Sequence, residues 1–361
     1  MYDYVVIGAA QAGLSIAYEL KKRELNFILF DKESEIGASW LNRWDSLKLF
    51  TPTEFNHLKG LSFPAPKGHY PTKYEVADYF KAYATKFEFP IRLNTLVEKV
   101  EKVTPRSFLV HTSSDTYQSK NVVVATGPFH TPYIPRFSKY IHESIFQIHS
   151  NFYKNPTQLK DGPTMVVGAG DSGFQILNEI SKQSERKVYY SGETKIGTLP
   201  QELLGKTLWW WFTKTGFLSV SKGSWIGKYL SKGKQPVIGT NVKEILKRNN
   251  VHCVGRCLDA EEKEIETEKE VLSDVKNIVW ATGYRPNFEW IEGLELDKDN
   301  YPKQKRGVSS MKGLYFIGLP WLHTRGSATL GGIKKDAKYL GEVFDLKKED
   351  IHTSSRLKSH A

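Results

Sequence analysis

The 361-residue chain has few cysteines and no long apolar run, and each absence excludes a class of protein. Its two cysteines, Cys253 and Cys257, have a C-x-x-x-C spacing, whereas thioredoxin-like and thioredoxin-reductase redox pairs have C-x-x-C. No apolar run approaches the ~20 residues that a membrane span needs. The first expected strand begins almost at the N-terminus, which leaves no room for a signal peptide. We therefore expect a protein of the reducing cytoplasm without spanning helices.

Acidic residues are outnumbered by basic ones, and the formal net charge is +11. Lysine is spread over the whole chain, so we expect a solvated basic surface that attracts anionic cofactors by long-range steering. No recognition motif accompanies this charge, so no nucleic-acid partner is expected. No catalytic triad, metal cluster or paired carboxylate is apparent, so no metal site is expected.

Two glycine-rich loops of the dinucleotide-binding type are the most informative feature. Gly8–Gly13 follows the apolar strand Tyr4–Ile7, Gly168–Gly173 follows the apolar strand Thr164–Val167, and each loop opens a helical pattern. In such a loop the first glycine makes the turn, the second lets the backbone approach a pyrophosphate, and the third lets helix and strand pack closely. Two such loops in separate βαβ settings predict two bound dinucleotides, as in an enzyme that passes hydride from a nicotinamide to a flavin.

The first loop is the candidate FAD site. Its middle position is Ala10, whose methyl group lies where the pyrophosphate must approach. This predicts a local adjustment and weaker retention of the dinucleotide, but not loss of the site. The next strand, Asn26–Phe30, ends in Asp31, where an acidic residue binds ribose hydroxyls. Asp31 would also repel a 2′-phosphate.

The second loop keeps all three glycines, Gly168, Gly170 and Gly173. The residues after the following strand choose between NADH and NADPH, because the adenosine ribose lies there. Ser191 and Lys195 can accept a 2′-phosphate, whereas Glu193 between them opposes one. Both NADH and NADPH therefore stay open.

Ala-Thr-Gly follows two further apolar strands, at Ala125-Thr126-Gly127 and at Ala281-Thr282-Gly283. Small residues at a strand end allow the backbone to lie close to a cofactor. Their positions, one between the two glycine loops and one after the second, suggest the two crossings between a flavin domain and an inserted nicotinamide domain.

Several segments together resemble the flavin-containing monooxygenases, in particular the YUCCA type and a bacterial branch labelled as cation-transport flavoproteins. The resemblance runs from Tyr4 to about Leu340 and is carried by Asp31–Trp40, Arg43–Pro52, Leu61–Pro64, Tyr70–Lys73 and Ala281–Pro286. It implies that Trp40 lies along the flavin, that the backbone of Val97 meets the adenine, and that the loop from Gly318 to Thr329 opens a final helix against the flavin. The candidate cofactor-binding residues are Gly8, Ala10, Gln11, Ala12, Gly13, Asp31, Lys32, Trp40, Val97, Ala125, Thr126, Gly127, Gly318, Ala328, Thr329, Gly168, Gly170, Asp171, Ser172, Gly173, Ser191, Lys195, Ala281, Thr282 and Gly283.

The predicted fold is α/β with two Rossmann-like domains. Residues 1–156 and 281–361 form the expected FAD-binding domain, and residues 157–280 form the NAD(P)H-binding domain. His149, in the family-like run His149-Ser150…Tyr153-Lys154, is expected to fix the crossover between the domains and not to act as a general base. No catalytic side chain is identifiable, because the cofactors carry the chemistry.

An aromatic insertion at about residues 200–235 contains Trp209-Trp210-Trp211. Three adjacent side chains cannot all face one side of a helix. The insertion is therefore expected to pack at the domain interface, to form a substrate-entry wall, or to touch a membrane surface with Lys206, Lys214, Lys222 and Lys228 facing headgroups.

The expected activity is an FAD- and NAD(P)H-dependent monooxygenase. Reduced FAD would meet O2 to give a C4a-(hydro)peroxide that oxygenates a soft N or S nucleophile or a carbonyl of a small substrate. Many relatives carry an asparagine near the flavin C4a in the segment that corresponds to Leu49–Thr51, which has none. An NAD(P)H oxidase or flavin-linked reductase is therefore the first alternative, and a non-enzymatic sensor or transport accessory is the second. The oligomeric state, including a homodimer, stays open.

Overall fold

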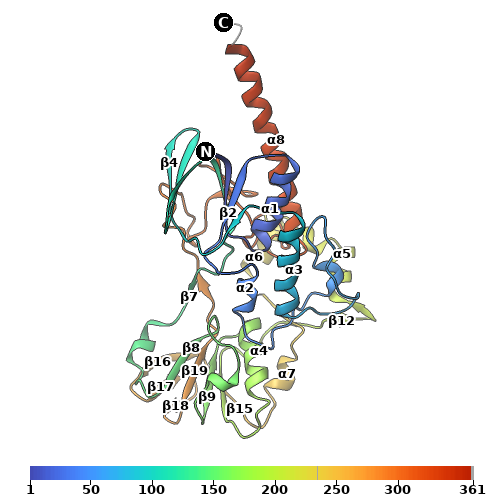
Figure 1. Ribbon diagram of the computed structural model, residues 1–361. Coiled ribbons are helices and arrows are strands. Elements are labelled where there is room, and N and C mark those ends of the chain that lie inside the picture. Colours follow the sequence, from blue (N-terminus) through green and yellow to red (C-terminus); the bar gives the residue numbers. More distant parts are fainter. Residues whose placement is uncertain (234, 359–361) are drawn as a thin grey trace.

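The computed structural model describes residues 1–233 and 235–358 and is built on two large sheets (Figure 1). The larger sheet, in the upper part of Figure 1, has nine strands and takes them from both ends of the chain. Its main order is β21 (Gln304–Lys305), β22 (Val308–Ser309), β23 (Leu314–Phe316), β6 (Thr116–Val124), β1 (Tyr2–Ile7), β2 (Phe27–Phe30) and β3 (Ile91–Arg92), and the hairpin of β4 (Val97–Thr104) and β5 (Ser107–Thr112) joins it at β6.

The second sheet, in the lower part of Figure 1, has five strands, all paired in parallel. Its order is β15 (Val251–Gly255), β10 (Val188–Ser191), β9 (Thr164–Val167), β19 (Asn277–Trp280) and β8 (Phe146–His149). A mixed sheet with a parallel centre and a second, fully parallel sheet, both with helices packed against them, confirm the predicted α/β class. Since the first sheet draws on both chain ends and the second on the middle, the topology agrees with an inserted domain.

One strand differs from the predicted division of the chain. Residues 1–156 were assigned to the first domain, yet β8 pairs with β19 in the second sheet, with Phe146 opposite Asn277 and His149 opposite Trp280. The run Phe-Gln-Ile-His is too short to show a strand period, so the sequence did not reveal its pairing. We propose that the inserted domain begins near Phe146 and ends near Trp280.

Small sheets and helices complete the chain. The small sheets pair β7 (Thr131–Pro132) with β20 (Tyr284–Arg285), β11 (Thr198–Leu199) with β14 (Val237–Ile238), β12 (Glu202–Leu203) with β13 (Lys206–Thr207), and β16 (Cys257–Glu261) and β18 (Val271–Leu272) with β17 (Glu264–Thr267). The α-helices are α1 (Gln11–Lys22), α2 (Ala38–Leu41), α3 (Lys73–Lys86), α4 (Asp171–Ile180), α5 (Leu208–Lys214), α6 (Trp225–Lys232), α7 (Val242–Ile245) and α8 (Ile333–Lys358). Short 3₁₀ turns cover Thr53–Phe55, Arg136–Tyr140, Pro156–Gln158 and Phe217–Ser219.

Strand β1 shows why the sheets are buried on both faces. Tyr4 and Val6 pack in one apolar cluster, with residues of α1, α3 and α8, whereas Val5 and Ile7 pack in a second cluster on the opposite face. The run Tyr4–Ile7 is apolar on both faces, which is typical of a strand in a parallel sheet covered on both sides. The burial fixes the register of β1, so the glycine loop that follows Ile7 emerges at a defined edge of the sheet.

Helix α3 is fixed at its start by a capping box. The backbone N–H of Glu75 donates to the Thr72 hydroxyl oxygen, and the backbone N–H of Thr72 donates to the Glu75 carboxylate. At the other end of the chain, α8 continues to Lys358 and projects beyond the larger sheet (Figure 1). The position of its first turns against α1 places the loop before Ile333 beside the first glycine loop.

Candidate active site

A cavity of about 440 Å³ lies at the carboxyl ends of β1, β2 and β6, where α1 begins. This edge of a parallel sheet is where α/β folds bind ligands. Seven of the candidate residues line the cavity, namely Gly8, Ala10, Asp31, Lys32, Val97, Ala125 and Thr126. The structure therefore gathers residues from four separate segments around one space.

The first glycine loop has the close contacts that a dinucleotide turn requires. Gly8 has a φ of +103°, and a Cβ there would lie 2.8 Å from the carbonyl oxygen of Ala125. A Cβ on Gly13 would lie 1.8 Å from the carbonyl oxygen of Gly8. Helix α1 starts after Ala10 without a side-chain cap, which leaves first-turn N–H groups free to bind phosphate. The residues present therefore fit the pyrophosphate of FAD.

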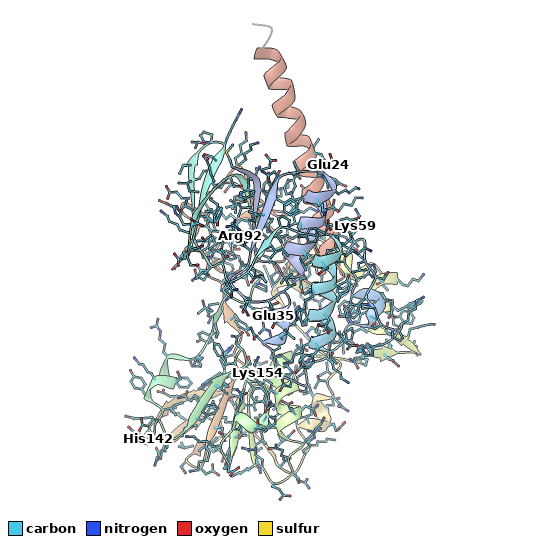
Figure 2. All side chains as sticks on the ribbon, viewed as in Figure 1. Glu24, Glu35, Lys59, Arg92, His142 and Lys154 are labelled. Carbon is cyan, nitrogen blue, oxygen red and sulfur yellow. The ribbon has the colours of Figure 1, made fainter. Side chains whose placement is uncertain are left out.

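Asp31 organises this loop as well as lining the cavity. Its Oδ2 accepts the backbone hydrogen of Ala9 at 2.6 Å, and its Oδ1 accepts that of Glu33 at 3.0 Å. Each carboxylate oxygen has a second lone pair, so both remain able to accept a ribose hydroxyl. Glu35, which also lines the cavity and is labelled in Figure 2, is paired with Lys81 at 2.7 Å.

The other candidates for FAD lie around this cavity rather than in its wall. The side-chain amide of Gln11 donates to the carbonyl oxygen of Ala328 at 3.1 Å. Ala12 is buried, and Gly318 packs against it so closely that a Cβ on Gly318 would lie 2.8 Å from the Ala12 methyl. Trp40 packs against the apolar cluster that contains Tyr4 and Val6. Gly127 follows Thr126, which lines the cavity.

Arg43 is a cavity residue that the sequence analysis did not single out. Its Nη1 donates to the Tyr284 hydroxyl at 2.5 Å and to the Asn151 Oδ1 at 3.4 Å, and its guanidinium lies 5.2 Å from the ring centre of Phe129. These partners lie far from Arg43 in the chain. Only the family-like segment that begins at Arg43 could have pointed to it.

The second glycine loop repeats the close contacts of the first. A Cβ on Gly168 would lie 2.2 Å from the carbonyl oxygen of Ala281, and one on Gly173 would lie 2.2 Å from that of Gly168. In contrast, no heavy atom lies within 4 Å of a Cβ built on Gly170. Gly170 is thus not needed for packing of the protein itself, and its lack of a side chain leaves open space at the start of α4.

The start of α4 is tied to the segment that follows the aromatic insertion. The Oδ1 of Asp171 accepts the backbone hydrogen of Ile238 at 3.1 Å, and burial raises the pKa of this carboxyl group. Ser172 follows in the first turn of the helix. After β19, the Thr282 hydroxyl donates to the carbonyl oxygen of Tyr133, which joins the two crossings.

The Ser191 side chain has a partner inside the domain. The Ser191 side chain is 1 % exposed, and its hydroxyl oxygen accepts the backbone hydrogen of Cys257 at 2.9 Å. Ser191 shares a strand face with Tyr189, because side chains alternate along β10, so it points into the domain. Lys195 is exposed and remains the candidate for a 2′-phosphate, as Glu193 remains the residue that opposes one.

His149 has the structural role that the sequence suggested. It is 1 % exposed, its Nε2 lies 3.0 Å from the carbonyl oxygen of Gly283, and its Nδ1 accepts the backbone hydrogen of Asn151. Lys154, just beyond, donates to the carbonyl oxygen of Leu41 at 3.3 Å and lies between the two sheets in Figure 2. This stretch therefore connects the two parts of the molecule.

A second cavity, of about 310 Å³, lies between the aromatic insertion and the start of α8. Trp209 and Phe212 of α5 form one wall, and Thr51 and Thr329 lie on others. Trp209 is 4 % exposed, and its indole nitrogen donates to the carbonyl oxygen of Phe50 at 3.0 Å. Helix α5 therefore packs on the segment around Phe50 through Trp209 and also borders this cavity.

A lysine–histidine pair closes this second cavity. The Lys334 ammonium donates to the Nε2 of His57 at 2.8 Å, and both side chains line the space. Burial lowers the pKa of both groups, which favours a neutral imidazole as the acceptor. No carboxylate among the described side chains forms an ion pair with Lys334. The cavity therefore combines aromatic walls with a cation that lacks an acidic partner.

The two cysteines are separate thiols in β15 and β16. Burial raises the pKa of Cys257 to about 12 and also raises that of Cys253. A thiol with a raised pKa is a poor nucleophile at neutral pH, which weighs against a dithiol redox centre. Among the described residues there is no cluster of potential metal ligands, and none of the helices is long and apolar enough to span a bilayer.

Comparison with known proteins agrees with this geometry. A family model described as pyridine nucleotide-disulphide oxidoreductase matches residues 5–202. The uncharacterized oxidoreductase CzcO of Bacillus subtilis is 44 % identical over 94 % of this chain and 98 % of its own length. The probable indole-3-pyruvate monooxygenase YUCCA7 of Arabidopsis thaliana is 25 % identical over 87 % of this chain and 82 % of its own.

Among solved structures, a flavin-containing monooxygenase from Stenotrophomonas maltophilia superposes with a TM-score of 0.76 over 96 % of this chain and 98 % of its own, at 23 % identity. At this identity the likeness establishes the shared fold. The matched family model shows that the chain belongs to the pyridine nucleotide-disulphide oxidoreductase family, and the 44 % identity to CzcO places it with the CzcO-type oxidoreductases.

Proposed function

We propose that the protein uses NAD(P)H and O2 to oxygenate a small organic substrate, with FAD in the first cavity and the substrate in the second. The observation that carries this proposal is a hydrogen bond that connects the surroundings of the two cavities. Gln11, in the first glycine loop, bonds the carbonyl oxygen of Ala328, and the adjacent Thr329 lines the second cavity. A flavin that extends from the first glycine loop toward Ala328 would therefore end beside the aromatic cavity.

The chain's own residues bind and orient the two dinucleotides. The first turn of α1 would hold the pyrophosphate of FAD, Asp31 its ribose, and the backbone at Val97 its adenine. The start of α4 would hold the pyrophosphate of NAD(P)H, with Lys195 near the adenosine ribose. When bound, FAD accepts hydride from the nicotinamide and activates O2 at its C4a carbon. The protein's contribution is to orient these groups and to exclude water.

The second cavity supports a substrate with an apolar body and an electron-rich or carbonyl group. Trp209 and Phe212 offer aromatic surface, and Lys334, whose partner His57 is not acidic, offers a hydrogen-bond donor with positive charge. A soft sulfur or nitrogen nucleophile, or a carbonyl carbon, could then face the flavin while a polar group of the substrate binds Lys334.

An NAD(P)H oxidase is the second candidate, and one observation favours it. In the segment where relatives carry an asparagine, Thr51 stands at the cavity wall. The nearby amide of Asn56 is buried and donates to the carbonyl oxygens of Thr51 at 2.6 Å and Pro52 at 3.3 Å. It is therefore committed to the backbone. With no side-chain amide offered at Thr51, activated oxygen could leave as hydrogen peroxide.

Stopped-flow spectroscopy separates the two candidates. The FAD-loaded protein is reduced anaerobically with NADPH or NADH and mixed with oxygenated buffer, with and without a panel of sulfides and ketones. A transient near-UV absorbance that decays faster with one substrate class, and product formed in step with NAD(P)H consumed, would support the monooxygenase. Direct return of oxidised flavin with stoichiometric peroxide, whatever substrate is present, would support the oxidase.

A further inference from the structure

The basic charge of the chain is less even than its spread of lysines suggests. Residues 203–233 contain five lysines and no acidic residue, and the lysines are Lys206, Lys214, Lys222, Lys228 and Lys232. All five are exposed, and none forms an ion pair with a described carboxylate. Some exposed lysines elsewhere do have acidic partners, as Lys120 has Asp3 and Lys187 has Asp274. This stretch therefore carries unneutralised positive charge.

The same stretch contains the most exposed of the large apolar side chains. Leu204, at the tip of the β12–β13 hairpin, is 82 % exposed, and Trp225 and Tyr229 on α6 are 80 % and 78 % exposed. No other large apolar side chain among the described residues is exposed to this extent. Exposed apolar side chains that gather in one element indicate a binding surface.

Helix α6 concentrates both properties on one face. Trp225, Lys228, Tyr229 and Lys232 follow the spacing i, i+3, i+4 and i+7, so they share one side of the helix. Gly227 is the buried residue of α6. A Cβ there would lie only 1.9 Å from the carbonyl oxygen of Ser221, so the helix backbone packs directly against residue 221. The helix is thus anchored through its backbone, and its aromatic and basic side chains point outward. We call these four residues the α6 surface.

We propose that the α6 surface docks the protein on a lipid bilayer that contains anionic lipids. Tryptophan and tyrosine prefer the interface between acyl chains and headgroups, and lysines beside them reach the phosphates. An interface with a second copy is disfavoured, because two such surfaces would bring their lysines together. Protein interfaces in general are depleted in lysine, which favours the bilayer over a protein partner.

Docking through α6 would also place the second cavity near the bilayer. The segment between α5 and α6 reaches the cavity wall through Leu218 and Ser219, and Lys335 of α8 donates to the Ser219 hydroxyl at 2.8 Å. The docked face and one wall of the cavity therefore belong to one continuous insertion.

Sedimentation with vesicles tests the proposal. The FAD-loaded protein is mixed with vesicles of phosphatidylcholine alone, or of phosphatidylcholine with phosphatidylglycerol, at low and high salt. We expect binding to the anionic vesicles that weakens as salt rises, because exposed charges are screened. The double variants Trp225→Ser/Tyr229→Ser and Lys228→Gln/Lys232→Gln should each lower the partition coefficient roughly tenfold or more.

The matched control is a similar aromatic–lysine pair on another part of the surface. Tyr140 is 58 % exposed, and the Lys139 ammonium lies 4.8 Å from its ring centre. The variant Lys139→Gln/Tyr140→Ser should bind vesicles like the wild type, and flavin content should be equal in all variants. The proposal fails if the wild type does not bind anionic vesicles, or if the α6 variants bind as well as the wild type. It also fails if sedimentation velocity shows that the α6 variants only abolish self-association.

Discussion

His149 bonds the carbonyl oxygen of Gly283 at 3.0 Å, and this contact joins the end of β8 to the turn that follows β19. The Nδ1 of His149 accepts the backbone hydrogen of Asn151, so Nε2 carries the ring hydrogen and donates it to Gly283. The imidazole is thereby neutral and held in one tautomer. The rings of His149 and Tyr284 are also nearly perpendicular, with ring centres 5.2 Å apart.

This geometry predicts a stability that depends on pH. Burial lowers the pKa of His149 in the folded protein, so the unfolded chain binds its proton more readily. The stabilisation is therefore present above the ordinary histidine pKa of about 6.5 and is lost as the pH falls below it. His149→Ala should lower the free energy of unfolding at pH 8 by about 1–3 kcal/mol, because Gly283 and Asn151 lose their partner. Urea unfolding at pH 8 and pH 5.5 measures both effects.

The control for this prediction is His252→Ala. His252 is exposed on β15, so its removal should leave the stability at pH 8 within about 0.5 kcal/mol of the wild type. The wild type should lose stability between pH 8 and pH 5.5, and His149→Ala should lose less. An equal loss in both proteins would show that another group governs the acid response.

Substitutions at the middle position of each glycine loop test how that position affects dinucleotide binding. No atom of the protein lies near a Cβ built on Gly170, so Gly170→Ala should keep the wild-type melting temperature yet raise the KM for NAD(P)H about tenfold. The opposite change, Ala10→Gly, should slow the dissociation of FAD, since it removes a methyl group from the cavity wall. Flavin retention after gel filtration and steady-state kinetics give the two readouts. Unchanged FAD retention in Ala10→Gly would show that the methyl group is harmless.

Sequence patterns predicted what depends on neighbouring residues. The strands before both glycine loops are where the apolar runs placed them, since β9 covers Thr164–Val167 and β1 includes Tyr4–Ile7. All four positions of β10 are buried, so alternation along this strand does not show which partner Ser191 has. Contacts between distant segments leave no such pattern. The pairing of β8 with β19 depends on the folded sheet, so the sequence could not have shown it.

The second cavity also depends on contacts between segments that are distant in the chain. Lys334 and His57 are 277 residues apart in the chain and meet only because α8 packs beside the loop after β2 and α2. Neither residue belongs to a recognisable local motif. In contrast, the first cavity was largely predicted, because the geometry of a dinucleotide turn is encoded in a few consecutive residues.

The nicotinamide preference should respond to Glu193. This exposed residue lies in the segment after β10, where a 2′-phosphate would bind, and its carboxylate opposes that charge. Glu193→Arg should raise the ratio of kcat/KM for NADPH to that for NADH by roughly 10- to 100-fold, because arginine binds phosphate in a bidentate manner. Glu185→Arg, the same charge change at an exposed residue before β10, should leave the ratio within about twofold. An unchanged ratio in Glu193→Arg would place the adenosine ribose elsewhere.

The cation in the second cavity gives the sharpest test of substrate placement. Lys334 has a neutral partner in His57 and no acidic one among the described side chains, so a substrate carboxylate would complete its hydrogen bonding. A hydrogen bond to a charged group contributes about 1.5–3 kcal/mol, which corresponds to roughly 10- to 150-fold in kcat/KM. Lys334→Met should lower kcat/KM for (phenylthio)acetate by this factor and change it little for (phenylthio)acetamide, as measured by NADPH consumption coupled to sulfoxide formation.

Lys338→Met provides the matched control, because Lys338 is exposed on the same helix and pairs with Glu342 at 3.7 Å. It removes the same charge four residues away and should leave the selectivity between carboxylate and amide unchanged.

The pKa of Lys334 is lowered by burial, so turnover of the carboxylate substrate should decline, as the pH rises, at a lower pH than an ordinary lysine would give. This decline should be absent in Lys334→Met. Equal losses for both substrates in Lys334→Met would instead assign Lys334 to the shape of the cavity, because a merely structural lysine cannot distinguish a carboxylate from its amide.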